Sequence, residues 1–114
     1  MSKSRAKGTH GENGVVNFLL SKGFKHAERR ALAGVNDKGD VAGIPGIVFE
    51  VKNHKSYKIP AWMKETEIER ENASADFGIL VVKPVGVSVQ NTGKWWAVMN
   101  LDDVTELLKK AGYR

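Results

Sequence analysis

The chain has 114 residues, 41% of them hydrophobic and 27% charged, which is typical of one folded domain and excludes wholesale disorder. It contains no cysteine, so disulfides, thiolate metal sites and thiol nucleophiles are excluded, and oxygen ligands would favour magnesium or manganese. The formal net charge of +5 favours a polyanionic partner such as nucleic acid. No apolar run is long enough to span a bilayer, and we expect a cytoplasmic protein without membrane contact.

The first eight residues carry Arg5 and Lys7 among small polar residues, without apolar periodicity. We expect residues 1–8 to form a flexible basic arm that lies along a phosphate backbone. The remaining chain, residues 9–114, is expected to form a single domain.

Apolar residues at helical spacing predict helices, runs rich in β-branched residues predict strands, and glycine or proline marks the turns between them. In chain order, the predicted elements are a helix at 9–22, strands at 24–30, 40–44 and 47–52, a helix at 59–75, strands at 77–82 and 95–99, and a helix at 101–111. Residues 33–39 are expected to form a glycine-bearing loop, and 85–90 show the alternation that is typical of strands. The order α-β-β-β-α-β-β-α predicts an α/β fold.

The strand predicted at 47–52 carries the first chemical signal. Successive side chains of a strand point to opposite faces, so Glu50 and Lys52 share one face while the apolar residues share the other. An ordinary half-exposed strand shows the same alternation. The pattern gains meaning from Asp40, because a hairpin that turns at Pro45-Gly46 would fold Asp40 back beside Glu50. Two carboxylates would then converge next to a lysine.

This predicted group suits phosphodiester hydrolysis. A divalent ion held by two carboxylates activates water and neutralises the charge that develops on the phosphate. Lys52 would orient the attacking water or stabilise charge in the transition state, and the backbone carbonyl of Val51 is a candidate further oxygen ligand. We therefore predict that Asp40, Glu50 and Lys52 are catalytic residues of a metal-dependent nuclease.

Asp40, nine intervening residues and then Glu50-Val51-Lys52 resemble the signature of the PD-(D/E)XK nuclease superfamily. Residues 9–82 also follow the element order of that superfamily's core. The resemblance implies a restriction-endonuclease-like fold, in which a mixed central β-sheet is flanked by helices, and an activity that depends on Mg²⁺, which Mn²⁺ can replace. The first motif has Gly39 where the signature has proline, a departure that leaves the acid in place.

Many members of the superfamily supply a further glutamate from the first helix, and Glu12 stands at the matching position. The resemblance makes Glu12 a fourth catalytic residue, and the implied metal ligands are Glu12, Asp40, Glu50 and Val51. Alternatively, Thr9-His10-Gly11-Glu12 is a capping box, in which Glu12 bonds only the backbone of Thr9. Against this alternative, Glu12 lies three and seven residues before Val15 and Leu19, at the end of the predicted buried stripe, where a carboxylate needs a partner.

A short basic N-terminus, a glutamate in the first helix and a chain of this size are similar to the Holliday junction resolvases of archaea and phages. This likeness implies a structure-specific endonuclease for branched double-stranded DNA, active in recombination and repair, as a homodimer in a bacterial, archaeal or phage-infected cell. The residues expected to contact DNA are Arg5, Lys7, Arg29, Arg30, His54, Lys55 and Lys58. The basic segment at 53–58 also fits a solvated loop.

Two alternatives remain open at this point. The first is another nuclease of the same superfamily, of the VRR, nicking or restriction-like kind. A restriction enzyme usually needs a further module to read base edges, and 114 residues leave little room for one. The second alternative is a non-catalytic, basic nucleic-acid-binding module in which the carboxylates form structural ion pairs.

Two further groups of residues are expected to be mainly structural. The second predicted helix carries four glutamates, which we expect on a solvated face with ion pairs to Lys64 and Arg70. They are Glu65, Glu67, Glu69 and Glu71. Glu67 or Glu69 could also contact the metal ligands without binding the metal directly. Trp95 and Trp96 point to opposite faces of the last strand. We expect one of them in the core, and the second either in the core on the other face or against a partner chain or base.

Overall fold

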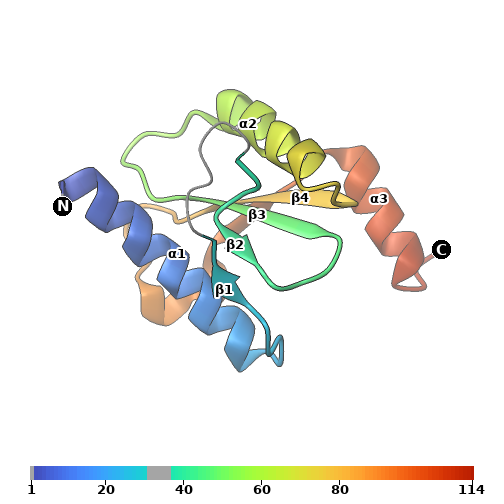
Figure 1. Ribbon diagram of the computed structural model, residues 1–114, viewed down its shortest axis with the longest axis horizontal. Coiled ribbons are helices and arrows are strands. Elements are labelled where there is room, and N and C mark those ends of the chain that lie inside the picture. Colours follow the sequence, from blue (N-terminus) through green and yellow to red (C-terminus); the bar gives the residue numbers. More distant parts are fainter. Residues whose placement is uncertain (1, 31–36) are drawn as a thin grey trace.

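The computed structural model describes residues 2–30 and 37–114, and its centre is one mixed sheet of five strands (Figure 1). The strands lie side by side in chain order and are β1 (Glu28–Arg29), β2 (Val41–Ala42), β3 (Ile47–Lys52), β4 (Phe77–Val82) and β5 (Trp96–Val98). The central strands β3 and β4 are parallel, and all other neighbours are antiparallel. The α/β fold with a mixed sheet flanked by helices is thus confirmed.

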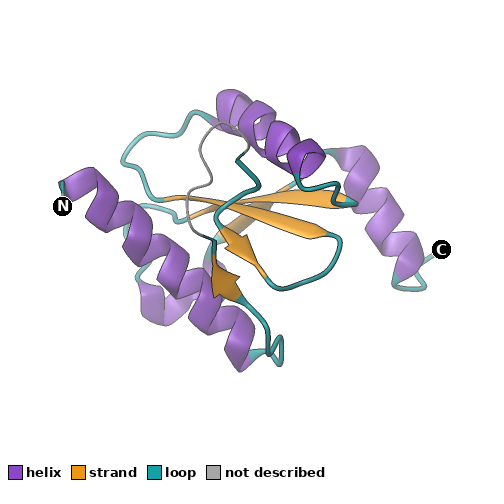
Figure 2. Cartoon of the chain, viewed as in Figure 1, coloured by secondary structure: helices purple, strands orange, loops and turns teal. Residues whose placement is uncertain are grey.

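The helices lie around this sheet, as Figure 2 shows. They are α1 (Lys3–Ser21), α2 (Ile59–Asn72), the 3-10 helix η1 (Val89–Lys94) and α3 (Leu101–Lys110). Because β3 and β4 are parallel, the chain between them must cross from one end of the sheet to the other, and α2 makes this crossing. Among the described residues, none of the helices combines the length and apolar character needed to cross a bilayer.

Helix α1 begins six residues before the predicted start, and the prediction of a flexible arm at 1–8 is wrong for residues 3–8. The Ser2 side chain caps the helix by accepting a hydrogen bond from the backbone N–H of Arg5. The backbone carbonyl of Lys7 also accepts a hydrogen bond from the Asn53 side chain, which ties the first turns to the loop after β3. Neither contact leaves a periodic apolar signal in the sequence. Met1 lies outside the described residues.

The predicted order of elements is confirmed, but several predicted strands are too long. The strand expected at 24–30 is reduced to β1, the strand expected at 40–44 is reduced to β2, and β5 is shorter than 95–99. Residues 85–90 form no strand; a turn leads there into η1, which packs beside α1. The first four residues of the loop predicted at 33–39 lie outside the described residues.

The two faces of the sheet bury different side chains, following the alternation of the strands. On one face, Phe49 and Val51 of β3 pack with Val15 and Leu19 of α1 and with Trp95. On the other face, two residues of β4 pack against Trp62 of α2; these residues are Leu80 and Val82. Position 50 alternates with 49 and 51, so Glu50 belongs to the face that α2 covers.

Helix α3 contrasts with α1 and α2, because none of its residues is buried. Its apolar residues follow a helical spacing along one side and include Leu101 and Leu108, which are 77% and 45% exposed. Figure 1 shows α3 at the end of the molecule opposite the N-terminus of α1. The final helix therefore presents an apolar side that the described part of the chain covers only in part.

Leu80 is fully buried in the middle of β4, which makes it a test of the described core. We expect Leu80→Ala to lower the free energy of unfolding by about 2–5 kcal/mol, through lost burial and the cavity left behind. Ile68→Ala is the control, because Ile68 is 58% exposed on α2 and its truncation should change stability by only about 0.5 kcal/mol. Urea unfolding measures both, and equal losses would contradict this core.

Candidate functional site

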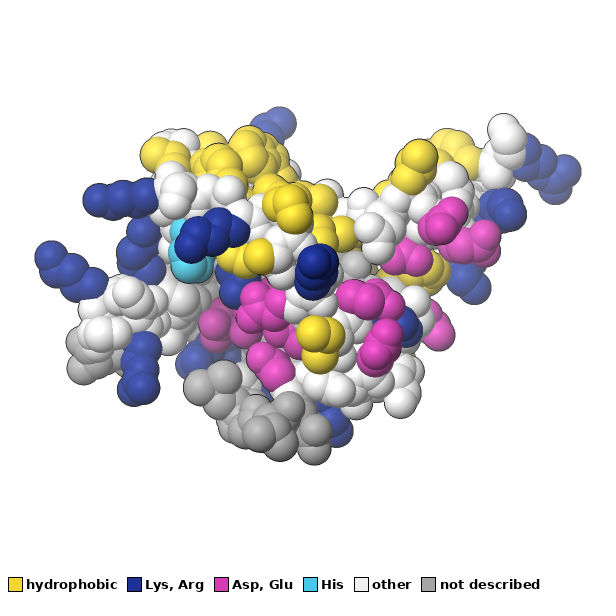
Figure 3. All heavy atoms as spheres, turned by 90° about the horizontal axis from the view of Figure 1, so that it is seen from above, with side chains coloured by type: hydrophobic (Ala, Val, Ile, Leu, Met, Phe, Trp, Pro, Cys, Tyr) yellow, Lys and Arg dark blue, Asp and Glu magenta, His cyan; other side chains and the backbone are white. Residues whose placement is uncertain are grey.

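Most of the predicted site residues surround one cavity of about 350 Å³ between the N-terminal half of α1, the end of β3 and the start of α2. The predicted residues in its wall are Lys7, Glu12, Asp40, Glu50, Val51, Lys52, His54 and Lys55. Figure 3 shows a group of acidic side chains at the centre of one face, with a histidine and several Lys and Arg side chains beside it. The cavity therefore has an acidic floor and a basic margin.

The hairpin between β2 and β3 brings Asp40 beside Glu50, as predicted. Val41 pairs with Phe49 in an antiparallel register, so position 40 lies opposite position 50. The backbone N–H of Asp40 donates to the carbonyl of Phe49 at 2.8 Å. In return, the Asp40 carboxylate accepts a hydrogen bond from the backbone N–H of Val51 at 2.8 Å through Oδ2. Asp40 is thus fixed against β3 by both its backbone and its side chain.

Gly39 has a backbone conformation that excludes proline at this position. Its φ is +96°, a value that the proline ring cannot adopt and that glycine adopts freely. A Cβ atom at this position would lie 2.5 Å from Cγ1 of Val48. The chain enters β2 through this close approach to β3, and Asp40 follows directly.

Lys52 is held between two carboxylates at the end of β3. Its Nζ lies 3.1 Å from Oε2 of Glu50 and 2.8 Å from Oε2 of Glu65 on α2. The ammonium also lies 5.9 Å from the centre of the Trp62 ring, within cation–π range. Partial burial lowers the pKa of Lys52, but Glu65 and Glu50 outweigh this effect and raise the pKa above its ordinary value. Lys52 is therefore a fixed positive charge in the cavity wall.

Glu50 and Glu69 are buried with too few partners for their oxygens. Glu50 is 3% exposed and Glu69 is 1% exposed, and Oε1 of Glu50 and both oxygens of Glu69 accept no hydrogen bond from the residues that the structure describes. Burial, followed by the negative charge of Asp40, raises the pKa of Glu50 to about 11. Burial also raises the pKa of Glu69 to about 8. Without a cation, these carboxyls hold protons at neutral pH.

The prediction that the glutamates of α2 form a solvated face is wrong for Glu69. Glu67 follows that prediction, because its carboxylate pairs with Arg70 at 2.6 Å on the outer side of the helix. Glu69 instead lies on the buried side with Trp62 and Thr66. The spacing from Trp62 carries the signal: positions three and seven residues after a buried tryptophan share its side of a helix, which places both Glu65 and Glu69 toward the sheet.

Glu12 does not cap a helix. Helix α1 begins at Lys3, so Glu12 lies in its middle, and the capping-box alternative is excluded. Its Oε1 accepts a hydrogen bond from Nε of Arg29 at 2.9 Å, which links α1 to β1. Burial raises the pKa of Glu12, although Arg29 opposes the shift. Glu12 reaches the cavity wall beside Asp40 while it is partly neutralised by an arginine.

The residues predicted to contact DNA separate into two groups. Lys7, His54 and Lys55 line the cavity, whereas the remaining four lie outside its wall: Arg5, Arg29, Arg30 and Lys58. Arg29 is bound to Glu12, and Arg30 lines a different hollow near the turn between β2 and β3. Partial burial lowers the pKa of His54, and the positive charges of Lys52 and Lys7 lower it further.

The oxygen atoms of this site fit a hard divalent cation. Asp40 before β2, Glu50 on β3 and Glu65 on α2 line the cavity. Three buried oxygens of Glu50 and Glu69 have no hydrogen-bond donor among the described residues. One oxygen from each of Glu50, Glu65 and Glu69 lies within 4.8 Å of the others. Oxygen donors at such separations are the ligands that Mg²⁺, Mn²⁺ and Ca²⁺ prefer. The residues present are therefore able to hold a metal ion.

Comparison with known proteins adds no family to this geometry. No family model, no curated protein sequence and no solved structure matches the chain.

The unpartnered carboxyls lead to a prediction for the metal-free protein. A carboxyl with a raised folded-state pKa keeps its proton while the unfolded chain loses it, so the stability it contributes at acid pH falls as the pH rises from about 4.3. For Glu69 this loss is complete above its folded pKa of about 8. We expect Glu69→Gln to make the pH dependence shallower and to raise the free energy of unfolding at pH 8 by about 1 kcal/mol or more.

Urea unfolding in EDTA at pH 5, 7 and 8.5 measures this effect. Glu71→Gln is the matched control, because it makes the same change on the exposed side of the same helix. Parallel pH profiles for Glu69→Gln and the wild type would contradict the described burial of Glu69.

Proposed function

We propose that this protein is a metal-dependent endonuclease that hydrolyses phosphodiester bonds in DNA, with branched junctions as its substrate. The observation that carries the proposal is the convergence of Asp40, Glu50 and Lys52 in one cavity with a basic margin. The resemblance of these residues to the PD-(D/E)XK signature points in the same direction. A binding module alone would not need buried carboxylates without partners, since these destabilise the fold.

Asp40, Glu50 and the backbone carbonyl of Val51 would hold Mg²⁺, or Mn²⁺ in its place, with Glu12 behind Asp40. A divalent ion bound there supplies a Lewis acid that makes water a better nucleophile and neutralises charge on the phosphate. The hydrogen bond from Val51 N–H orients the Asp40 carboxylate, so one oxygen faces β3 and the other remains for the ion. Arg29 holds the Glu12 carboxylate at the edge of the same group.

Lys52 would stabilise the additional negative charge that the phosphate gains as it is attacked. Glu65, Glu50 and the Trp62 ring hold its ammonium in place, so little reorganisation is needed when the substrate binds. Lys7 and Lys55 would bind neighbouring phosphates along the margin of the cavity. These contacts recognise the shape and charge of the backbone rather than base sequence, which suits a branched substrate.

We propose further that the protein acts as a homodimer through α3. The apolar side of this helix is exposed, and its charges divide along its length: Asp102 and Asp103 lie in the first turn, while Lys109 and Lys110 lie in the last. Two antiparallel α3 helices related by a two-fold axis would bury the apolar sides and place each acidic half against the partner's basic half. Symmetric cleavage of a four-way junction needs two such related active sites.

The proposal is tested with labelled four-way junction, fork, linear duplex and single-stranded DNA in Mg²⁺. We expect symmetric nicks near the junction centre, and a rate at least about 100-fold lower for Glu50→Gln, because the variant loses charge stabilisation in the transition state. Binding of the junction should survive. Glu71→Gln is the control, since this exposed glutamate on α2 lies outside the cavity wall.

Other outcomes of this assay separate the alternatives. Metal-dependent cleavage of the linear or forked substrates alone would indicate a nuclease of the VRR, nicking or restriction-like kind. Binding without cleavage of any substrate would leave a non-catalytic nucleic-acid-binding module.

The dimer is tested by sedimentation of the wild type and of Leu101→Gln/Leu108→Gln. We expect the double variant to raise the dimer dissociation constant at least about tenfold, because two apolar side chains lose their burial. Its free energy of unfolding as a monomer should change little, since both leucines are exposed. Glu106→Gln introduces the same residue on the polar side of α3 and should leave the dimer intact. A monomeric wild type would refute the dimer.

A further inference from the structure

Glu69 is the buried carboxyl that the proposed reaction does not use. It lies on α2 facing the sheet, is 1% exposed, and neither of its carboxylate oxygens accepts a hydrogen bond within the described part of the chain. A carboxylate buried in this way destabilises the fold unless a proton or a cation accompanies it. An apolar residue at the same position would pack without that cost, so the carboxylate calls for a partner.

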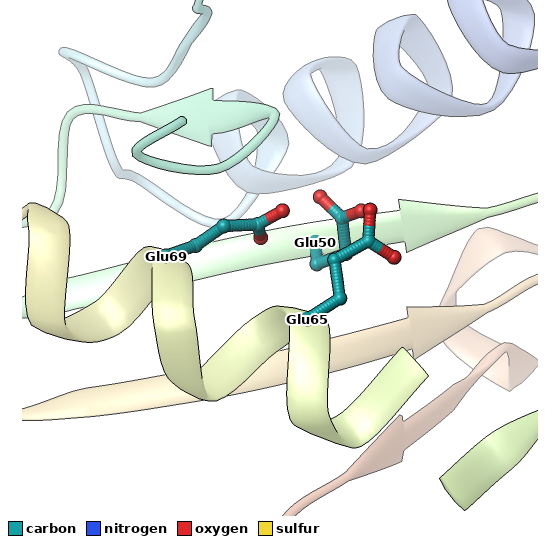
Figure 4. Close-up of side chains that lie close together, drawn as sticks. All are labelled: Glu50, Glu65 and Glu69. Atoms are coloured by element: carbon teal, nitrogen blue, oxygen red, sulfur yellow. The ribbon is translucent and has the colours of Figure 1, made fainter. Parts of the chain in front are cut away.

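The oxygens around Glu69 form a set with room for such a partner. Figure 4 shows Glu65 and Glu69 extending from successive turns of α2 toward Glu50 on β3. One oxygen from each of these three residues lies within 4.8 Å of the others. Lys52 bonds Oε2 of Glu50 and Oε2 of Glu65. Each of these two carboxylates therefore keeps its Oε1 for another interaction, and Glu69 keeps both oxygens.

The charges of the group exceed what one divalent ion can balance. Asp40 contributes a fourth carboxylate, and Lys52 contributes the ammonium that is bonded inside the group. With these four carboxylates ionised and Lys52 protonated, the group carries three uncompensated negative charges, and Asp37 in the wall of the same cavity adds a fourth. One divalent ion would leave negative charge facing an incoming phosphate, whereas two would balance the group.

We propose that Glu50, Glu65 and Glu69 form a second divalent-cation site on the α2 side of the cavity, with Glu50 shared between the two sites. The first site consists of Asp40, Glu50 and the carbonyl of Val51, so the inference rests on the proposed function for that set alone. Carboxylates that bridge two neighbouring ions are a common arrangement in enzymes that cleave phosphate esters. The three glutamates offer oxygen ligands only, which selects Mg²⁺ or Mn²⁺ over softer metals.

The test counts Mn²⁺ ions on the metal-free protein at pH 7.5 without DNA, from the electron paramagnetic resonance signal of free Mn²⁺. We expect two ions for the wild type, one for Glu69→Gln, and two for the control Glu71→Gln, which changes an exposed glutamate of the same helix. Asp40→Asn should retain the ion on the α2 side. Glu65→Gln should weaken one of the two affinities at least about tenfold.

A single ion on the wild type, or two undiminished ions on Glu69→Gln, would overturn the second site. Circular dichroism and urea unfolding check that each variant is folded. Should Glu69→Gln fail to fold, Glu65→Gln decides the matter, because Glu65 is partly exposed and its loss leaves the core intact. Two bound ions without cleavage of any DNA would support the second site and refute the nuclease. Cleavage with only one bound ion would support the nuclease and refute the second site.

Discussion

The burial of the Glu50 carboxylate between β3 and α2 is the constraint around which the rest of the site is arranged. Strand β3 is paired on both sides, so the direction of each of its side chains is set by hydrogen bonds to β2 and β4. Phe49 and Val51 enter the core beneath α1, and position 50 must then face α2. Asp40, Lys52 and Glu69 surround this carboxylate, and each adds to or offsets its charge.

Apolar packing around the site offsets the free energy that is lost by burying these carboxyl groups. Leu80, Val82 and Trp62 form a compact group on the same face, next to the acidic residues. The sheet and α2 are therefore held together by apolar contacts, which lets carboxylates with unpartnered oxygens persist between them. Such local instability within a stable frame is typical of sites whose groups act on a ligand rather than on the fold.

The two ends of the molecule differ in chemistry. The N-terminal half of α1 carries basic residues beside the cavity, and its link to β1 through Glu12 and Arg29 fixes its position relative to the hairpin. At the far end, α3 has an exposed apolar side and a division of charge along its length (Figure 1). The surface that we propose for DNA and the surface that we propose for a second copy of the chain therefore lie apart.

The sequence by itself determined the order of the elements, the hairpin that brings Asp40 to Glu50, and the shared face of Glu50 and Lys52, because these depend on local periodicity and on one tight turn. The start of α1 and the pairing of Glu12 with Arg29 were decided only by tertiary structure. The spacing from Trp62 indicates the side of α2 that Glu69 shares, but its complete burial was also decided by tertiary structure. Each of these depends on a contact between segments that are distant in the chain or on packing against the sheet. From sequence alone, a charged residue on a helix is predicted to be exposed to solvent. For Glu69 this prediction fails because α2 packs against β3.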